Sequence, residues 1–290
     1  MLYRFAISLH RHFIEIPMYK FLCCILLVIA IFSGLKAETI RGIARDAVTG
    51  EMLIGSTIYI KELKKGTKQS VLMDIINKLG IKNIEIRREF IQDFHKELES
   101  ISEKSKLYNM KVYYSVPEWL YKENRLLVHN LEKYFKEAKD MNCHNVKLTI
   151  GQFVQFDIKD IEVINKLSEK YQVKLTVEND QTKINGKSEA INKFLVEVKN
   201  LKGRVTLTFD IGNWAFQGED SLKNAQLLKS FVTYIHLKDV DKERNNVLLN
   251  EGIIDWKSVL GKLPKALPIA LEYPCDTKEV LQLEINKILK

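Results

Sequence analysis

Four side chains that can bind metal ions and move protons stand at the ends of four successive strand-like segments in the second half of the chain. They are Glu178, Asp210, His236 and Glu272. Each alone is more often a helix cap, an ion-pair partner or a satisfied core group, but three carboxylates gathered together repel one another unless a cation lies among them. One imidazole and three carboxylates suit Mn²⁺, Mg²⁺, Co²⁺ or Zn²⁺. If the fold brings the four together, their types predict one divalent metal ion as cofactor.

The elements that would position these residues alternate along the chain from about residue 54 onward. The expected strands are 56–61, 83–89, 111–117, 145–151, 173–180, 204–212, 231–239 and 267–274. The expected helices between and after them are 69–79, 90–105, 123–141, 158–170, 187–199, 221–229, 255–263 and 277–289. Eight such units in about 240 residues predict an α/β protein, a (β/α)8 TIM barrel with a short N-terminal extension. No Gly-x-Gly-x-x-Gly follows the first strand, so a dinucleotide-binding fold has no support.

The two faces of the expected strands differ in polarity, because successive side chains of a strand point to opposite faces. In the strand that ends near Asp210, Leu207 and Phe209 lie on one face. Thr206 and Thr208 share the other face with Asp210. A barrel interior is normally filled by Val, Ile and Leu, and buried charges are costly unless they are paired or bound to a metal. The polar inner faces therefore predict an active site at the C-terminal ends of the strands.

Basic residues occur on the same inner faces. They are Lys61, Arg87, Lys147, Lys174 and Lys238. Glu85, Arg87 and Lys238 are the candidate substrate-binding residues among the charged groups, and the positive charges fit an anionic substrate such as a sugar phosphate or a sugar acid. An alternative of equal weight is that Arg87 pairs with Glu85 or Glu89, and that Lys238 pairs with Asp239.

Short motifs around the four metal-type residues resemble those of the xylose-isomerase-like superfamily, most closely its sugar phosphate isomerase/epimerase branch. The motifs are Val177-Glu-Asn-Asp180, Thr208-Phe-Asp-Ile-Gly-Asn-Trp214, Tyr234-Ile-His-Leu-Lys-Asp239 and Ala270-Leu-Glu-Tyr-Pro274. They come in the family's order, at the family's strands, and the resemblance spans nearly all of residues 52–290. The match is specific for the fold and the metal site, and it is not specific for the substrate.

The resemblance implies a metal-dependent sugar or sugar phosphate isomerase or epimerase with a small-molecule substrate. In that family two glutamates bind the metal and also move protons, and here these are Glu178 and Glu272. The implied reaction removes a proton from the carbon next to a carbonyl, through an enediolate that the metal stabilises. Proton return to the neighbouring carbon gives an isomerase, and return to the original carbon from the other face gives an epimerase. A homo-oligomer is compatible with this reading.

One position departs from the family pattern. Many family epimerases have a histidine three residues after the strand-six aspartate, where this chain has Asn213 followed by Trp214. Asparagine can hydrogen-bond a sugar hydroxyl, and tryptophan can stack on a sugar face, so both are expected to bind substrate. An altered choice of substrate follows from this departure more readily than a loss of metal binding. A lyase, a dehydratase or an inactive member of the family stays open.

The first 51 residues are expected to form an extension of the barrel at residues 52–290. Residues 18–37 read as a secretory signal whose apolar core is shorter than the ~20 residues of a membrane span. No stable membrane partner is therefore expected unless this segment is an uncleaved anchor. Residues 38–60 resemble the opening of the carboxypeptidase-regulatory-like β-sandwich of TonB-dependent receptors, but the further strands are absent. The barrel chemistry suits the cytoplasm and the signal-like segment suggests export, so the location stays open.

Charge and composition limit the other classes of function. The net charge is +8, but no basic run is long enough to favour nucleic acid as a partner. The same superfamily includes DNA-repair endonucleases that bind three zinc ions, which need many histidines. Of six histidines here, only His236 ends an expected strand. The remaining alternatives are an inactive or metal-free sugar-binding barrel and a fragment of an exported receptor.

Overall fold

A computed structural model describes residues 54–56, 66–273, 275 and 277–289. All of them belong to the unit that runs from Met52 to Lys290. The signal-like segment, the sandwich-like piece except for residues 54–56, and Lys61 lie outside the described residues, so the expectations for them, including a separate extension, stay predictions. None of the helices in the described ranges has the length and hydropathy that a membrane span requires.

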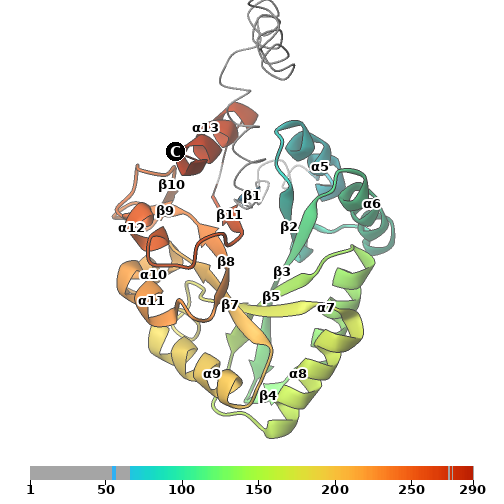
Figure 1. Cartoon of the computed structure of the whole chain (residues 1–290), viewed down its shortest axis with the longest axis vertical. Coiled ribbons are helices and arrows are strands. Elements are labelled where there is room, and N and C mark those ends of the chain that lie inside the picture. The colour runs from blue at the N-terminus through green and yellow to red at the C-terminus, as the bar shows by residue number, and fades with distance from the viewer. Residues whose placement is uncertain (1–53, 57–65, 274, 276, 290) are drawn as a thin grey trace, which may run out of the picture. The chain divides into compact units, whose positions relative to one another are not determined.

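A closed ring of parallel strands forms the centre of this unit (Figure 1). In chain order the strands are β1 (Ile54–Ser56), β2 (Asn83–Arg87), β3 (Lys111–Lys122), β5 (Asn145–Gly151), β6 (Lys174–Glu178), β7 (Val205–Asp210), β8 (Val232–Leu237) and β11 (Ile269–Leu271). Each pairs in parallel with the next, and β11 also pairs with β1, which closes the ring. The expected (β/α)8 TIM barrel is thereby confirmed.

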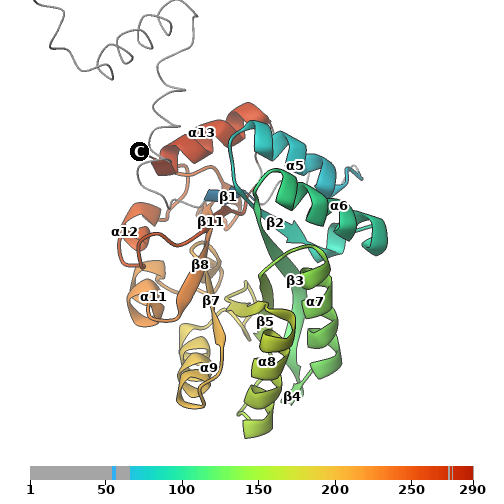
Figure 2. The same ribbon diagram turned by 45° about the vertical axis from the view of Figure 1, so that its right-hand side comes forward.

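Helices cover the outside of the ring, and Figure 2 shows α5 and α6 side by side next to β2 and β3. The helices are α5 (Gln69–Lys78), α6 (Phe94–Leu107), α7 (Val128–Asp140), α8 (Ile158–Tyr171), α9 (Ser188–Asn200), α10 (Asn213–Phe216), α11 (Ser221–Leu228), α12 (Trp256–Leu260) and α13 (Lys278–Leu289), with a 3-10 turn η1 (Arg88–Phe90). Several begin at an aspartate whose carboxylate accepts backbone N–H groups of the first turn, namely Asp93, Asp157, Asp220 and Asp255.

The alternating faces of the strands separate a hydrophobic layer from a polar interior. Leu207 and Phe209 of β7 are fully buried, as is Phe194 of α9, which packs against this strand. On the inner face, Thr208 donates a hydrogen bond of 2.8 Å to the hydroxyl of Thr176 on β6. The hydroxyl pair satisfies two buried polar groups in the interior. The polarity of the two faces therefore agrees with the alternation in the sequence.

Strand β3 continues past residue 117, where the sequence predicted its end, and forms an antiparallel hairpin with β4 (Arg125–Leu126). The register between β3 and β5 shifts between Ser115 and Trp119. Pro117 lies in this irregular stretch, where its missing N–H interrupts no regular ladder. The hairpin uses the residues that were expected to begin a helix at 123, so the predicted start of that helix was wrong.

Gly151 ends β5 at a point where the backbone of β3 leaves no room for a side chain. Its φ is +77°, and a Cβ there would collide with the carbonyl of Tyr121 and lie 2.7 Å from Cβ of Trp119. Gly80 has a similar φ of +76°, but a Cβ there would have nothing within 4 Å. The two glycines share a backbone conformation, and only Gly151 also needs the space.

We predict that Gly151→Ala destabilises the protein more than Gly80→Ala does. Both changes place a side chain on left-handed backbone, at a cost of about 1–2 kcal/mol. Only Gly151→Ala adds a steric clash, which raises the cost by a further ~1–3 kcal/mol. Urea unfolding of the two variants measures the difference, and equal losses of stability would contradict the prediction.

Candidate functional site

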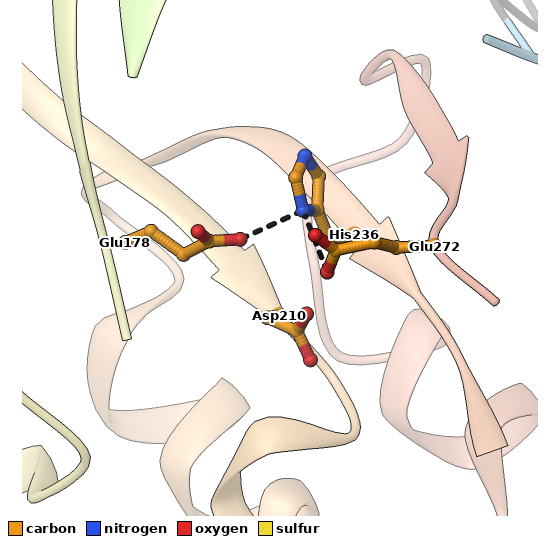
Figure 3. A group of neighbouring side chains, drawn as sticks. All are labelled: Glu178, Asp210, His236 and Glu272. Atoms are coloured by element: carbon orange, nitrogen blue, oxygen red, sulfur yellow. Dashed lines mark ion pairs between the residues drawn. The ribbon is translucent and has the colours of Figure 1, made fainter. Parts of the chain in front are cut away.

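Glu178, Asp210, His236 and Glu272 meet at the C-terminal ends of neighbouring strands. Glu178 and Asp210 end β6 and β7, His236 lies near the end of β8, and Glu272 directly follows β11. Figure 3 shows their side chains pointing toward one another. Each offers one ligand atom, and these atoms all lie within 4.8 Å of one another. The structure therefore gathers into one cluster the four residues that the sequence singled out.

The register of the parallel strands accounts for this gathering. Asp210 pairs directly with His236 across β7 and β8, and His236 pairs with Ala270 of β11. Residues at the same level of a barrel that point inward converge on its axis. Glu272 lies two residues after Ala270 and so faces the interior as Ala270 does. The cluster thus depends on strand pairing that no single motif encodes.

The ring of His236 is fully buried and faces a carboxylate at each of its nitrogens. Its Nε2 lies 2.8 Å from Oε2 of Glu85, and its Nδ1 lies 2.7 Å from Oε1 of Glu178 and 3.2 Å from Oε2 of Glu272. Burial alone would lower the pKa of His236. The surrounding carboxylates, Glu85 first among them, outweigh burial and raise this pKa well above the ordinary value. With Glu85 on Nε2, the histidine presents Nδ1 to the cluster.

The donor atoms of the cluster fit a divalent metal ion. Glu178 Oε1, Asp210 Oδ2 and His236 Nδ1 are buried and lack a hydrogen bond of regular geometry, although Oε1 and Nδ1 form an ion pair with each other and Oδ2 forms one with Lys238. Such orphaned polar atoms are rare in folded proteins, and here they face one another. A cation among them would satisfy all three, and a set of one imidazole nitrogen and carboxylate oxygens is one that Mn²⁺, Mg²⁺, Co²⁺ and Zn²⁺ accept.

Two buried lysines contact the same carboxylates. Lys238 Nζ lies 2.9 Å from Oδ2 of Asp210 and 3.0 Å from Oε2 of Glu272, and Lys147 Nζ lies 2.5 Å from Oε2 of Glu178. The contact of Lys238 with Asp210 is an ion pair at a short distance, and Oδ2 has no hydrogen bond of regular geometry. Burial lowers the pKa of each lysine, but the carboxylates outweigh it and raise both values. The ammonium groups therefore balance part of the negative charge of the cluster.

Burial disfavours the ionised form of Asp210, and the effect shows in its pKa. Burial raises its pKa to about 8, although the ammonium of Lys238 opposes that shift. Its Oδ1 accepts backbone N–H groups of Gly212 and Asn213 at 2.8 and 2.7 Å, at the start of α10. These two bonds fix the side chain so that Oδ2 faces the cluster.

A cavity of about 350 Å³ opens beside the cluster. Its volume lies within the range of small-molecule sites. Glu178 and Glu272 line the cavity, whereas the fully buried Asp210 and His236 do not. Of the four cluster residues, the two glutamates are therefore the ones in position to touch a ligand.

Three of the expected substrate-binding residues also line the cavity, namely Arg87, Asn213 and Lys238. Asn213 donates from Nδ2 to the carbonyl of Asn179 at 2.8 Å, while its buried Oδ1 has no partner. A carbonyl oxygen in this state is an acceptor that a ligand hydroxyl can satisfy. The position therefore suits the role expected from the sequence.

Glu85, Trp214 and Lys174 are not among the residues that line the cavity, so the structure does not bring them together with the other expected substrate-binding residues. Glu85 is buried behind His236 rather than exposed to a ligand. The short helix α10 turns the indole of Trp214 into the core, fully buried and 5.4 Å from the ring of Phe209, so it has no face free for a sugar. Lys174 is exposed at the beginning of β6, at the opposite end from the cluster.

The alternative pairings of Arg87 and Lys238 are realised in part. Arg87 pairs with Glu89, with Nε 2.8 Å from Oε1, and also lies 3.3 Å from Glu272. Lys238 pairs with the cluster carboxylates and not with Asp239. The buried carboxylate of Asp239 instead accepts N–H groups of the loop that follows it, where β9 (Asp239–Val240) pairs with β10 (Asn246–Val247).

Trp119 at the cavity and Asn185 close to it are residues that the sequence analysis did not single out. Trp119 lines the cavity from the part of β3 beyond its expected end. The apolar residues Leu120 and Tyr121 after it were the signal that the strand continues. Asn185 accepts a hydrogen bond from Gly151 N–H at 2.8 Å and donates one to Asp180 at 2.9 Å, so it ties the loop after β6 to β5. A single asparagine in a polar loop carries no pattern that predicts this role.

Comparison with known proteins places this arrangement in context. The family model of the xylose isomerase-like TIM barrel matches residues 73–288. A D-tagatose 3-epimerase-like protein is similar in structure, with 17% identity, a TM-score of 0.62, and coverage of 82% of this chain and 96% of that chain. So is the probable 3-DHS dehydratase from Bacillus anthracis, with 13% identity, a TM-score of 0.61, and coverage of 82% and 99%.

A third similar structure is the 3-keto-D-glucoside 4-epimerase from E. coli, with 10% identity, a TM-score of 0.60, and coverage of 82% of this chain and 98% of that chain. At these identities the likeness shows the fold and leaves the reaction open. None of the curated proteins matches the chain in sequence.

We predict that Lys238→Met destabilises the metal-free protein by about 3 kcal/mol, because it leaves the buried carboxylates of Asp210 and Glu272 without their ammonium partner. Lys174→Met is the matched control, since Lys174 is exposed at the other end of a strand. Urea unfolding in the presence of a chelator measures both variants. A loss for Lys238→Met no larger than that for the control would contradict the ion-pair role.

Proposed function

Because this chain belongs to the family of xylose isomerase-like TIM barrels, we propose that it is a metal-dependent sugar isomerase or epimerase. Its substrate would be a small sugar or sugar phosphate. One observation carries the proposal: two glutamates of the metal-type cluster, Glu178 and Glu272, line the same cavity. An epimerase, which removes a proton from one face of a carbon and returns one to the other face, needs two such groups at one ligand.

Four residues would hold the metal ion through the atoms that already face one another. When bound, a divalent ion supplies a Lewis acid that polarises the carbonyl next to the proton to be moved. Asp210 would present Oδ2, because the N–H groups after it hold Oδ1. His236 would present Nδ1, because Glu85 binds Nε2. A carboxylate on the outer nitrogen of a ligating histidine fixes both the ring and its tautomer, and this is the role that we assign to Glu85.

The two glutamates would carry the proton transfer. One carboxylate takes the proton from the carbon next to the carbonyl; the C–H electron pair forms a C=C bond, and the carbonyl π pair moves onto its oxygen, which gives an enediolate. The other glutamate, in its acid form, returns a proton. Return to the neighbouring carbon moves the carbonyl and makes an isomerase, and return to the same carbon from the opposite face makes an epimerase.

The charges around the glutamates support the role of a base. Burial would raise the pKa of Glu178, but Lys147 and His236 lower it below the ordinary value. Burial is likewise outweighed at Glu272, where Lys238 and His236 lower the pKa. Either carboxylate can therefore act as the base that takes the first proton, and the glutamate that returns a proton must first take one up from solvent.

Other groups at the cavity suit a sugar. Oδ1 of Asn213 is an unpartnered acceptor for a hydroxyl group. Trp119 offers an aromatic side chain at the cavity wall, which is the kind of apolar surface that sugar sites combine with a few polar groups. Trp119 thus takes the stacking role that the sequence analysis expected of Trp214.

We predict that the full-length protein binds about one Mn, Mg, Co or Zn ion per chain and that His236→Ala loses it, because the change removes one of the ligand atoms. His144→Ala is the matched control, since His144 is an exposed histidine. Mass spectrometry of the metal content after loading with each ion gives the result. A wild type that binds none of the four ions, or a His236→Ala variant that keeps its metal, would overturn the assigned ligands.

We predict that Glu178→Gln and Glu272→Gln each lower proton exchange by about 10²–10⁴-fold, because an amide can neither take nor return the proton. The measurement is uptake of deuterium from D₂O into a panel of sugars and sugar phosphates. Glu189→Gln, an exposed glutamate of α9, serves as control. Wild-type exchange in either variant would contradict the assignment, and metal binding by the wild type without any exchange would indicate an inactive sugar-binding barrel.

A further inference from the structure

A bound cation would leave Lys147 its ion-pair partner but would take the ion-pair partners of Lys238. Lys147 contacts Oε2 of Glu178, whereas the orphaned atom of that carboxylate is Oε1. A cation held by Oε1 would leave the partner of Lys147 in place. Lys238 instead contacts Oδ2 of Asp210, the orphaned atom that a cation would take, and Oε2 of Glu272, which also faces His236 Nδ1. Lys238 and a bound cation thus compete for the same oxygens.

Among the described residues, Lys238 forms ion pairs with Asp210 and Glu272 alone, while Glu178 acts on it from farther away. Only 4% of the residue is exposed, so water compensates little of its charge. The carboxylate of Asp239, the next residue, already accepts hydrogen bonds of 2.9–3.1 Å from backbone N–H groups of its own loop. The remaining neighbour on the open side is the cavity, which Lys238 lines.

The backbone holds Lys238 at this wall. The stem of the side chain passes so close to Gly212 that a Cβ there would overlap Cγ and lie 3.2 Å from Cδ and Cε. A stem packed against backbone cannot turn freely, so Nζ stays between the carboxylates and the cavity. Arg87 lines the same cavity and lies 3.3 Å from Oε1 of Glu272, so a second cation contacts the other oxygen of that carboxylate.

We propose that the substrate of this site carries an acidic group, a carboxylate or a phosphate, which Lys238 binds once a metal occupies Asp210 and Glu272. The inference rests on the proposed metal dependence and narrows its substrate class. The ammonium repelled by the cation gains a charge-assisted hydrogen bond to the ligand. Metal binding and recognition of the anion are thereby linked. Without metal, Lys238 forms ion pairs with Asp210 and Glu272; with metal, it binds the acidic group of the substrate.

The test compares three polyols that share a carbon skeleton and cannot be turned over: D-glucitol, D-glucitol 6-phosphate and D-gluconate. Calorimetric titration of the full-length, Mn-loaded wild type should give at least about tenfold tighter binding of one charged polyol than of D-glucitol, the effect of one charge-assisted hydrogen bond. The charged polyol that is preferred identifies the acidic group. In metal-free protein the preference should shrink. Equal binding of all three polyols would overturn the inference.

The variant Lys238→Met separates the lysine from direct attraction to the metal. At equal Mn content the preference should fall to near unity, and Lys174→Met should keep it. Lys238→Gln, which keeps hydrogen-bond donors and drops the charge, replaces Lys238→Met if that variant does not fold. A preference that survives both changes would overturn the role of Lys238.

Deuterium exchange separates this inference from the proposed function. A protein that prefers a charged polyol through Lys238 but exchanges no proton on any sugar would contradict the isomerase proposal and support the anion site. Exchange on neutral sugars with equal binding of the three polyols would support the isomerase proposal and contradict the anion site.

Discussion

The burial of several carboxylates around one histidine is the constraint on which the rest of this structure depends. Glu85, Glu178 and Glu272 all contact the ring of His236, which water does not reach. Like charges so close together are tolerated only where cations compensate them. The lysines beside the cluster, the orientation of the imidazole and the orphaned ligand atoms are all consequences of that requirement.

The barrel meets this constraint through its geometry. Inward side chains of neighbouring strands stand at matched levels, so a polar residue near each strand end contributes to one site without any long loop. The outer faces remain apolar and pack against the helices, which leaves stability to the hydrophobic layer. The interior is thereby free to hold charges that would be unfavourable elsewhere in the core.

The site also has two ways to balance its charge. In the described structure the ammonium groups of Lys147 and Lys238 neutralise carboxylates that a metal ion would otherwise share. Lys147 binds an oxygen away from the orphaned atoms, and Lys238 binds at one of them. This asymmetry gives the two lysines different parts in the proposed chemistry, although both are buried amines on barrel strands or at their ends.

The sequence by itself determined the order of strands and helices, the family and the four cluster residues. Residue type and its alternation along each strand are local properties, and in a barrel that alternation decides which side chains point inward. Only the tertiary structure decided which neighbours reach the cavity. Trp119 lines it and Trp214 does not, since a bulged extension of β3 and the turn of α10 set the directions of the two indoles. The position of Glu85 behind His236 was decided in the same way, by strands that are distant in sequence and adjacent only in the closed ring.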